Sequence, residues 1–179
     1  MAGWSANNKY TLFGALRSAA QLISYEIPMA VTLITIVMAV GSMGLQDIIA
    51  HQSQNGLGWG GAFGWHLFRN PFLFIAFFIY YICALAETNR APFDVAEGES
   101  EIVAGFHIEY TGMKFGIWFL AEFLHAFTIG ALMAVLFLGG WRGPLVDEIP
   151  VLGVVYFLAK TYVMYFVVMW IRSTLPRIR

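Results

Sequence analysis

The residues best suited to chemistry in this sequence are acids that gather in one short stretch. Six carboxylates lie between positions 87 and 109: Glu87, Asp94, Glu97, Glu99, Glu101 and Glu109. If Asp94 caps a short helix, Glu97 and Glu101 fall on one face of that helix, where like charges repel. Crowding and desolvation both raise the pKa of a carboxyl group, so such acids can hold protons. The stretch is a candidate proton store; the alternative is a solvated acidic surface.

Further ionisable residues lie within apolar stretches, where a charge is costly and marks an ion path or a proton relay. They are Arg17, Glu26, Glu122, His125 and Lys160. Glu122 and His125 share a helical face at i and i+3, and we expect Lys160, in the middle of an apolar run, to have an acidic partner. Together these groups would suit a hydrogen-bonded proton wire. His125 could instead be a hydrogen-bonded packing residue, and the stem of Lys160 could extend toward a membrane surface.

Other kinds of reactive site find no support in the sequence. Glu122 and His125 match the Glu-x-x-His spacing of di-iron helix bundles, but a second such pair is absent, so no metal site is predicted. The lone Cys83 excludes a disulfide framework and a cysteine-ligated metal. No phosphate-binding loop, zinc-protease motif or nucleophile elbow occurs. By itself the chain carries no recognisable site for covalent or hydrolytic catalysis.

The composition predicts that these groups lie in a membrane protein. Of the 179 residues, 59% are hydrophobic and 12% are charged, whereas soluble proteins have about 45–50% apolar and about 25% charged residues. The mean hydropathy is +0.69. A formal net charge of −1 leaves no basic excess with which to bind nucleic acid. The expected surroundings are therefore a lipid bilayer.

Four apolar stretches are long enough to cross a bilayer as helices, since a span needs about 20 residues. The expected spans cover about residues 24–46, 70–88, 116–140 and 149–171, and residues 87–115 form a long acidic loop. Positive charge favours the cytoplasmic side, and it is concentrated on one side, at Lys9, Arg90, Lys114, Arg172, Arg177 and Arg179. We expect residues 1–179 to form a single membrane domain, an all-α polytopic transmembrane helix bundle with a cytoplasmic acidic loop.

The acidic stretch also resembles a known family. Its segments Glu87–Asp94 (ETNRAPFD), Glu97–Glu101 (EGESE) and Val103–Tyr110 (VAGFHIEY) resemble the signature of the quinone-site membrane subunit of respiratory complex I. The likeness continues on both sides of the loop, in Ser5–Tyr10, Gly14–Arg17, Ser24–Pro28, Met113–Phe115, Ala121–Glu122 and Phe137–Trp141. It therefore covers nearly the whole chain.

The resemblance implies a subunit at the junction of the membrane arm and the peripheral arm of a proton-pumping NADH:quinone oxidoreductase, not catalytic alone. In the family, the quinone tail passes among the helices of this subunit, and its glutamates are thought to couple quinone reduction to proton translocation. The positions that match the family are Arg17, Glu26, Glu87, Arg90, Asp94, Glu97, Glu99, Glu101, Glu109 and Glu122. Of these, Arg17 and Arg90 would shape the quinone channel or the loop. His125 and Lys160 join the expected relay on residue chemistry, with less support from the family.

The resemblance also implies partners and a location. Quinone would be the substrate, no cofactor would be covalently bound, and iron–sulfur clusters and flavin would lie in partner subunits. The partners would be peripheral iron–sulfur and quinone-site subunits and neighbouring membrane-arm subunits. The expected location is the bacterial cytoplasmic (inner) membrane, with the mitochondrial inner membrane as the alternative.

The chain departs from the family in length, and other functions stay open. The family has further membrane helices before the position of Met1 and another span beyond that of Arg179, so we expect a fragment, an incomplete subunit or a subunit split into two chains. One alternative function is the membrane anchor of an energy-converting hydrogenase. Another is an ion-transport subunit that has no redox partner.

Overall fold

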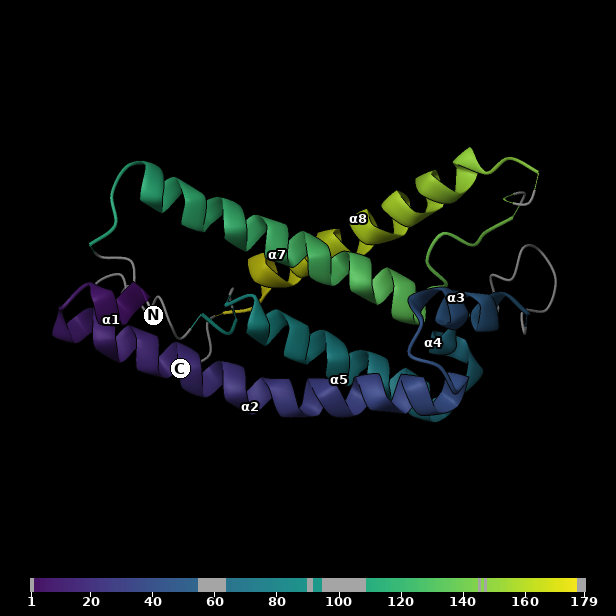
Figure 1. Cartoon of the computed structure of the whole chain (residues 1–179), viewed down its shortest axis with the longest axis horizontal. Helices are drawn as coiled ribbons and strands as arrows, with labels where there is room; N and C mark the ends of the chain where they lie inside the picture. The colour runs from purple at the N-terminus through teal and green to yellow at the C-terminus, as the bar shows by residue number, and fades with distance from the viewer. Residues whose placement is uncertain are drawn as a thin grey trace.

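The computed structural model describes residues 2–54, 64–89, 92–94, 109–144, 146 and 148–176, and these residues contain helices and no strand (Figure 1). The helices are α1 (Ala2–Ser5), α2 (Lys9–Val40), α3 (Leu45–Gln54), α4 (His66–Arg69), α5 (Pro71–Glu87), α7 (Met113–Phe137) and α8 (Val151–Thr174). The predicted all-α architecture is confirmed. The segment that holds Glu97, Glu99 and Glu101 lies outside the described residues, as does Arg90.

Local signals set the ends of the long helix α2. The Asn8 side chain caps its start by accepting a hydrogen bond from the Tyr10 backbone N–H at 3.2 Å. The helix continues through Pro28 and ends before Gly41, whose φ of 79° is left-handed and reverses the chain. The helix in the first expected span therefore ends at Val40 and not near residue 46.

Two pairs of helices make up most of the molecule. Helix α2 packs along α5, and α7 packs on α8, which it crosses in Figure 1. The buried core joins all four helices through Ile36 of α2, Tyr80 of α5, Phe137 of α7 and Val168 of α8. The Phe137 ring lies 5.8 Å from that of Tyr80. This apolar contact fixes how the two pairs meet.

The two ends of the bundle differ. We call the end that contains Lys9, Glu87, Met113 and Thr174 the loop end, because the acidic stretch connects α5 to α7 there (Figure 1). At the opposite end, which we call the cap end, α3 and α4 contact the last part of α7. Residues 133–140 are all buried at the cap end, whereas residues 111–121 are all exposed at the loop end.

The helix lengths suit a membrane. Helices α2, α7 and α8 have 32, 25 and 24 residues and are apolar enough to cross a bilayer. Helix α5 is also apolar but has 17 residues, which is near the lower limit of about 17 for a span. Its role as a fourth span stays a prediction.

Candidate functional site

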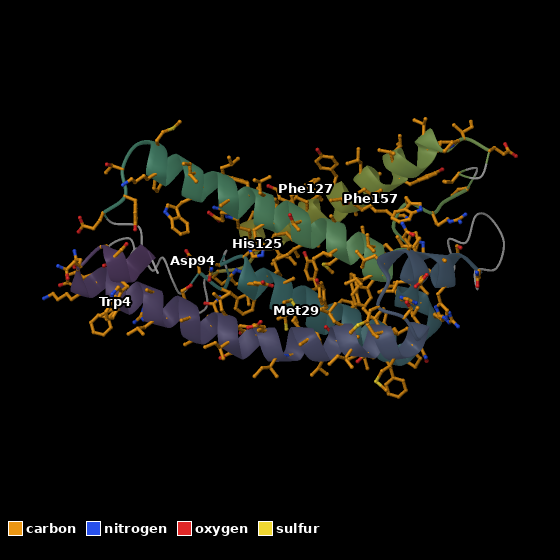
Figure 2. All side chains as sticks on the ribbon, viewed as in Figure 1. Trp4, Met29, Asp94, His125, Phe127 and Phe157 are labelled. Atoms are coloured by element: carbon orange, nitrogen blue, oxygen red, sulfur yellow. The ribbon has the colours of Figure 1, made fainter. Side chains whose placement is uncertain are left out.

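The structure brings together two of the predicted relay residues from different helices. Glu87 is the last residue of α5, and its Oε1 lies 3.7 Å from Nε2 of His125 on α7. Figure 2 shows His125 on the side of α7 that faces α5. The His125 and Glu87 side chains are 44% and 30% exposed, respectively. An ion pair therefore forms when the imidazole is protonated, at a separation that one water molecule or a small rotamer change could convert into a hydrogen bond.

Glu122 adds a second carboxylate beside this pair. It lies on α7 three residues before His125, hence on the same helical face, and its side chain is half-buried. In the described residues, Glu87, Glu122 and His125 thus form a small group of ionisable side chains at the loop end. We call these three residues the loop-end cluster. His125 thus contacts the carboxylate of Glu87 and shares a face of α7 with the carboxylate of Glu122.

The end of α5 is held by hydrogen bonds that fix the position of Glu87. The backbone N–H of Thr88 donates to the Ala84 carbonyl at 3.2 Å, and the Thr88 hydroxyl donates to the Leu85 carbonyl at 2.8 Å. Asn89 follows with a φ of 49°, in the left-handed region that Asn tolerates. The chain therefore leaves the direction of α5 within two residues of Glu87.

Gln21 of α2 anchors the start of the acidic stretch. Its Nε2 donates to the backbone carbonyls of Ala86 at 2.7 Å and of Phe93 at 2.9 Å. The Tyr25 ring, one turn further along α2, meets the Phe93 ring edge to face at 5.5 Å. Sequence analysis missed Gln21 and Tyr25 because neither carries a charge, although an amide within an apolar helix was a usable signal.

A second anchor holds the far end of the acidic stretch. The Asn8 Nδ2 donates to Oε1 of Glu109 at 3.1 Å, and the Ser5 and Tyr110 hydroxyls lie 3.0 Å apart in a hydrogen bond. Both ends of the acidic stretch are therefore hydrogen-bonded either to the first half of α2 or to the segment at α1 that precedes it.

The other predicted site residues take separate positions. Arg17 and Glu26 are exposed on α2. Asp94, labelled in Figure 2, is half-buried directly after Phe93. Each of Arg17, Asp94 and Glu122 has an interaction partner of its own. Four predicted residues lie outside the described part of the chain: Arg90, Glu97, Glu99 and Glu101.

Lys160 corrects one expectation. In the described part of the chain its partners are backbone carbonyls and not an acid: Nζ donates to Gly140 at 2.9 Å and to Arg142 at 2.8 Å. The ammonium also lies 5.2 Å from the centre of the Trp65 ring. The connection that follows α7 folds back onto α8, so its carbonyls reach Lys160 at the cap end, away from the loop-end cluster. Sequence alone does not predict such backbone partners, because every residue carries a carbonyl and nothing in the sequence distinguishes the ones that Lys160 binds.

A buried polar group that sequence analysis missed lies at the same cap end. Gln52 of α3 donates through Nε2 to the carbonyls of Val135 and Leu136 at 3.1 and 3.2 Å, and Nδ1 of His66 donates to Leu136 at 2.9 Å. His51 is 3.4 Å from His66 between ring nitrogens. Burial lowers the pKa of His66 below its usual value. These side chains satisfy the carbonyls that α7 leaves free at its C-terminus.

Comparison of the sequence with known proteins places the chain in a family. The chain matches the family model described as NADH dehydrogenase over residues 1–179. It is 46% identical over 188 aligned positions to a protein of Chlorobaculum parvum (strain DSM 263 / NCIMB 8327) that is named as a subunit of NADH-quinone oxidoreductase. The match covers 99% of this chain and 51% of the relative, so the chain spans about half the length of that relative. Matched from end to end by the family model, the chain belongs to the NADH dehydrogenase family.

Proposed function

We propose that this chain is part of the membrane subunit of a proton-pumping NADH:quinone oxidoreductase. In this role it contributes wall to a quinone channel and supplies carboxylates that couple quinone reduction to proton translocation. Flavin and iron–sulfur clusters belong to partner subunits, which include the peripheral quinone-site subunits and the neighbouring membrane-arm subunits. The family membership and the name of the relative support this role, and the membrane is the inner membrane of a bacterium.

The observation that carries the proposal is the contact between Glu87 and His125. The two residues belong to different helix pairs, α2–α5 and α7–α8, and their side chains meet at 3.7 Å. A proton that passes from Glu87 to His125 therefore crosses from one pair to the other. Glu122, one turn away on α7, is the next acceptor on the same face. A side-chain proton relay needs groups within hydrogen-bond reach, and the fold brings Glu87 and His125 to within a small rotamer change of it.

The anchors of the acidic stretch support a link between this relay and the quinone. Gln21 fixes Ala86 and Phe93, which flank Glu87 and Asp94, and Asn8 fixes Glu109. Both ends of the stretch are thus tied to the loop end. In the proposal, the remaining carboxylates of the stretch pass protons to and from Glu87: Asp94, Glu97, Glu99, Glu101 and Glu109. Lys160 is left out, because its ammonium is held at the cap end.

Two arginines have proposed roles outside the relay itself. Arg90 pairs with neighbouring carboxylates of the stretch and shapes it. Arg17 lies exposed on α2, where it lines the quinone channel together with the parts of the assembly outside this chain. Glu26, exposed on the same helix, is a further carboxylate of the proposed relay.

The test is a set of neutral variants in the complete assembly. NADH:quinone reductase activity and proton pumping are measured for three variants: Glu87→Gln, His125→Gln and the double variant. Reduction of an artificial acceptor by NADH serves as the measure of electron entry. We expect pumping to fall about tenfold or more, as for loss of a positioned proton-transfer group, while electron entry is unchanged. The double variant should lose no more than the worse single variant, because residues of one relay act as a unit.

Glu148→Gln is the matched control, since Glu148 is exposed in the connection between α7 and α8 at the cap end. Full pumping in all three relay variants would exclude the relay through α5 and α7. Ion transport without NADH and quinone would instead support the ion-transport alternative. A copurifying nickel-containing protein would support the hydrogenase anchor.

A further inference from the structure

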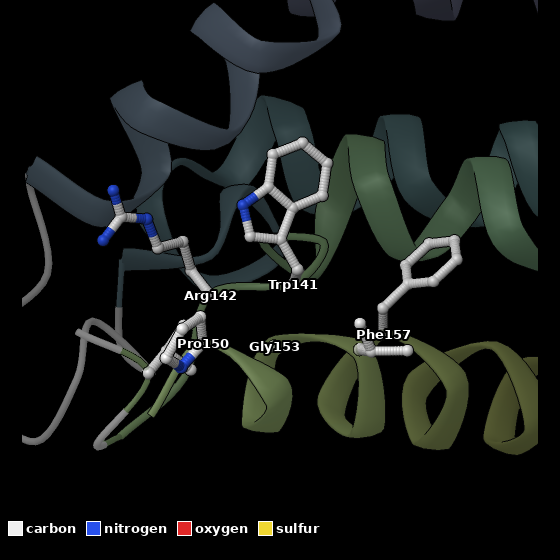
Figure 3. Close-up of a pocket in the computed structure, with 7 residues that line it drawn as sticks. Trp141, Arg142, Pro150, Gly153 and Phe157 are labelled. Carbon is white, nitrogen blue, oxygen red and sulfur yellow. The ribbon is translucent and has the colours of Figure 1, made fainter. Parts of the chain in front are cut away.

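A groove lies at the cap end, between the connection that follows α7 and the first turns of α8 (Figure 3). Its volume is about 460 Å³, within the range of about 300–1,000 Å³ that ligand sites occupy. The lining side chains are mostly apolar and include one cation: Trp141, Arg142, Val146, Pro150, Val154 and Phe157. The groove is on the opposite end of the helices from Glu87 and His125, so it is separate from the proposed relay.

Close approach of the backbone forms this groove. Gly153 of α8 is buried, and a Cβ added there would lie 3.4 Å from both the Trp141 carbonyl oxygen and Cγ1 of Val146. Lys160 fixes the other side of the connection through its hydrogen bonds to Gly140 and Arg142. The groove is therefore held open by contacts within the chain itself.

Polarity changes along the groove. Pro150 precedes α8, and Val154 and Phe157 lie one and two turns into it, so the groove extends about 10 Å along a helix that rises about 1.5 Å per residue. In Figure 3, Arg142 lies at one edge and Phe157 at the other, with Trp141 between them. Helix α8 is long and apolar enough to cross a bilayer, and Trp is enriched where lipid meets water. If α8 spans the bilayer, we expect the Arg142 edge at the membrane surface and the Phe157 edge in the apolar layer.

We propose that this groove binds one anionic phospholipid. Its phosphate pairs with the Arg142 guanidinium, and one acyl chain follows Val154 and Phe157 into the bilayer. A guanidinium has five N–H donors, so it can bind a phosphate beside its present contact. The single cation at the surface edge and the apolar deep edge match the two parts of such a lipid. A quinone would fill the deep edge but has no anionic group to pair with the guanidinium.

The experiment uses the complete assembly in bilayers that contain a phosphatidylglycerol with a photoreactive group in its acyl chain. After irradiation, mass spectrometry compares labelling of residues 150–158 with labelling of residues 162–170. The second segment holds the exposed Tyr162, Val163 and Phe166 and serves as an internal reference for bulk lipid. We expect the ratio to be about tenfold higher than with a photoreactive phosphatidylcholine, because the choline cation of that lipid neutralises its headgroup and weakens the attraction of its phosphate to Arg142.

Two variants and their matched controls complete the test. Arg142→Gln removes the cation, and Val154→Trp fills the groove; both should lower the labelling ratio to that of phosphatidylcholine. The labelling ratio should be unchanged in two control variants: Arg172→Gln, at the other end of α8, and Val155→Trp, outside the groove. Equal ratios for the two lipids, or labelling that both variants leave intact, would overturn the proposal. Labelling displaced by free quinone and not by unlabelled phosphatidylglycerol would overturn it as well. None of these readouts depends on pumping, so the proposed function is tested separately.

Discussion

At the level of single residues, Lys160 shows how an ammonium is accommodated in an apolar helix. Its two hydrogen bonds go to the carbonyls of Gly140 and Arg142, just beyond the C-terminus of α7. Backbone carbonyl oxygens carry partial negative charge and accept hydrogen bonds, so they can stabilise an ammonium without a carboxylate. Lys160 therefore links α8 to the connection that precedes it.

Replacement of Lys160 by Met should destabilise the chain without a direct effect on proton transfer. The variant leaves two carbonyls without their donor, and each buried unpaired group costs about 1–3 kcal/mol. We expect a lower temperature of unfolding for the purified assembly and normal pumping per folded complex. Lys114→Met, at the exposed start of α7, is the control and should be neutral. Loss of pumping at unchanged stability would instead return Lys160 to the relay.

At the level of helices, α3 and α4 act as a cap on the end of α7. The carbonyls of Val135 and Leu136 have no partner within α7's own C-terminal turn and are satisfied by Gln52 and His66. His66 is fully buried, so its Nδ1–H is committed to Leu136 and its Nε2 is left to accept from His51. A neutral His66 suits this arrangement.

The cap should loosen in acid. Burial lowers the pKa of both histidines, and the charge of Arg69 lowers that of His51 further, from a usual value of 6.5. Below about pH 6.5 the unfolded chain therefore binds more protons than the folded chain. The free energy of unfolding then decreases as the pH is lowered, until the pH is below the lowered pKa values of the folded chain. Hydrogen exchange of α3 amides should be faster at about pH 5.5 than expected from the intrinsic pH effect. His66→Asn, whose amide can donate to Leu136, should weaken this pH dependence; an unchanged dependence would show that His66 is not its source.

At the level of the whole molecule, the arrangement is two helix pairs that meet most closely at the cap end. Gly130 allows α7 to approach α8, because a Cβ there would lie 3.3 Å from the Thr161 carbonyl oxygen. The first part of α7 leaves the bundle, as Figure 1 shows, and residues 111–121 are exposed. Glu87 and His125 therefore meet where the two pairs begin to separate.

A larger side chain at Gly130 should disturb the packing of α7 on α8. We expect Gly130→Leu to lower the free energy of unfolding by about 1–3 kcal/mol, the usual cost of overpacking. Gly116→Leu is a matched control on the same helix, because a Cβ at Gly116 meets nothing within 4 Å. Denaturant unfolding of the two variants would measure the difference. Equal stability would mean that the α7–α8 crossing does not depend on close approach at Gly130.

The sequence by itself did not predict the short helices α3 and α4, but it determined the class of protein, its all-α fold and the family. These are local or compositional properties: apolar runs form helices wherever they fold, and the motif from Glu87 to Tyr110 is contiguous. The ends of helices were less certain, since the left-handed Gly41 ends α2 at Val40, well before the expected limit of 46.

Only the tertiary structure decided which groups are partners. Glu87 and His125 lie far apart in the sequence, and their contact depends on how α7 lies over α5. Backbone carbonyls are the acceptors for four side-chain donors: Gln21, Gln52, His66 and Lys160. Because every residue has a carbonyl, sequence identifies the donor but not the acceptor. The acceptor becomes defined only when helices end and pack, leaving particular carbonyls unpaired within reach.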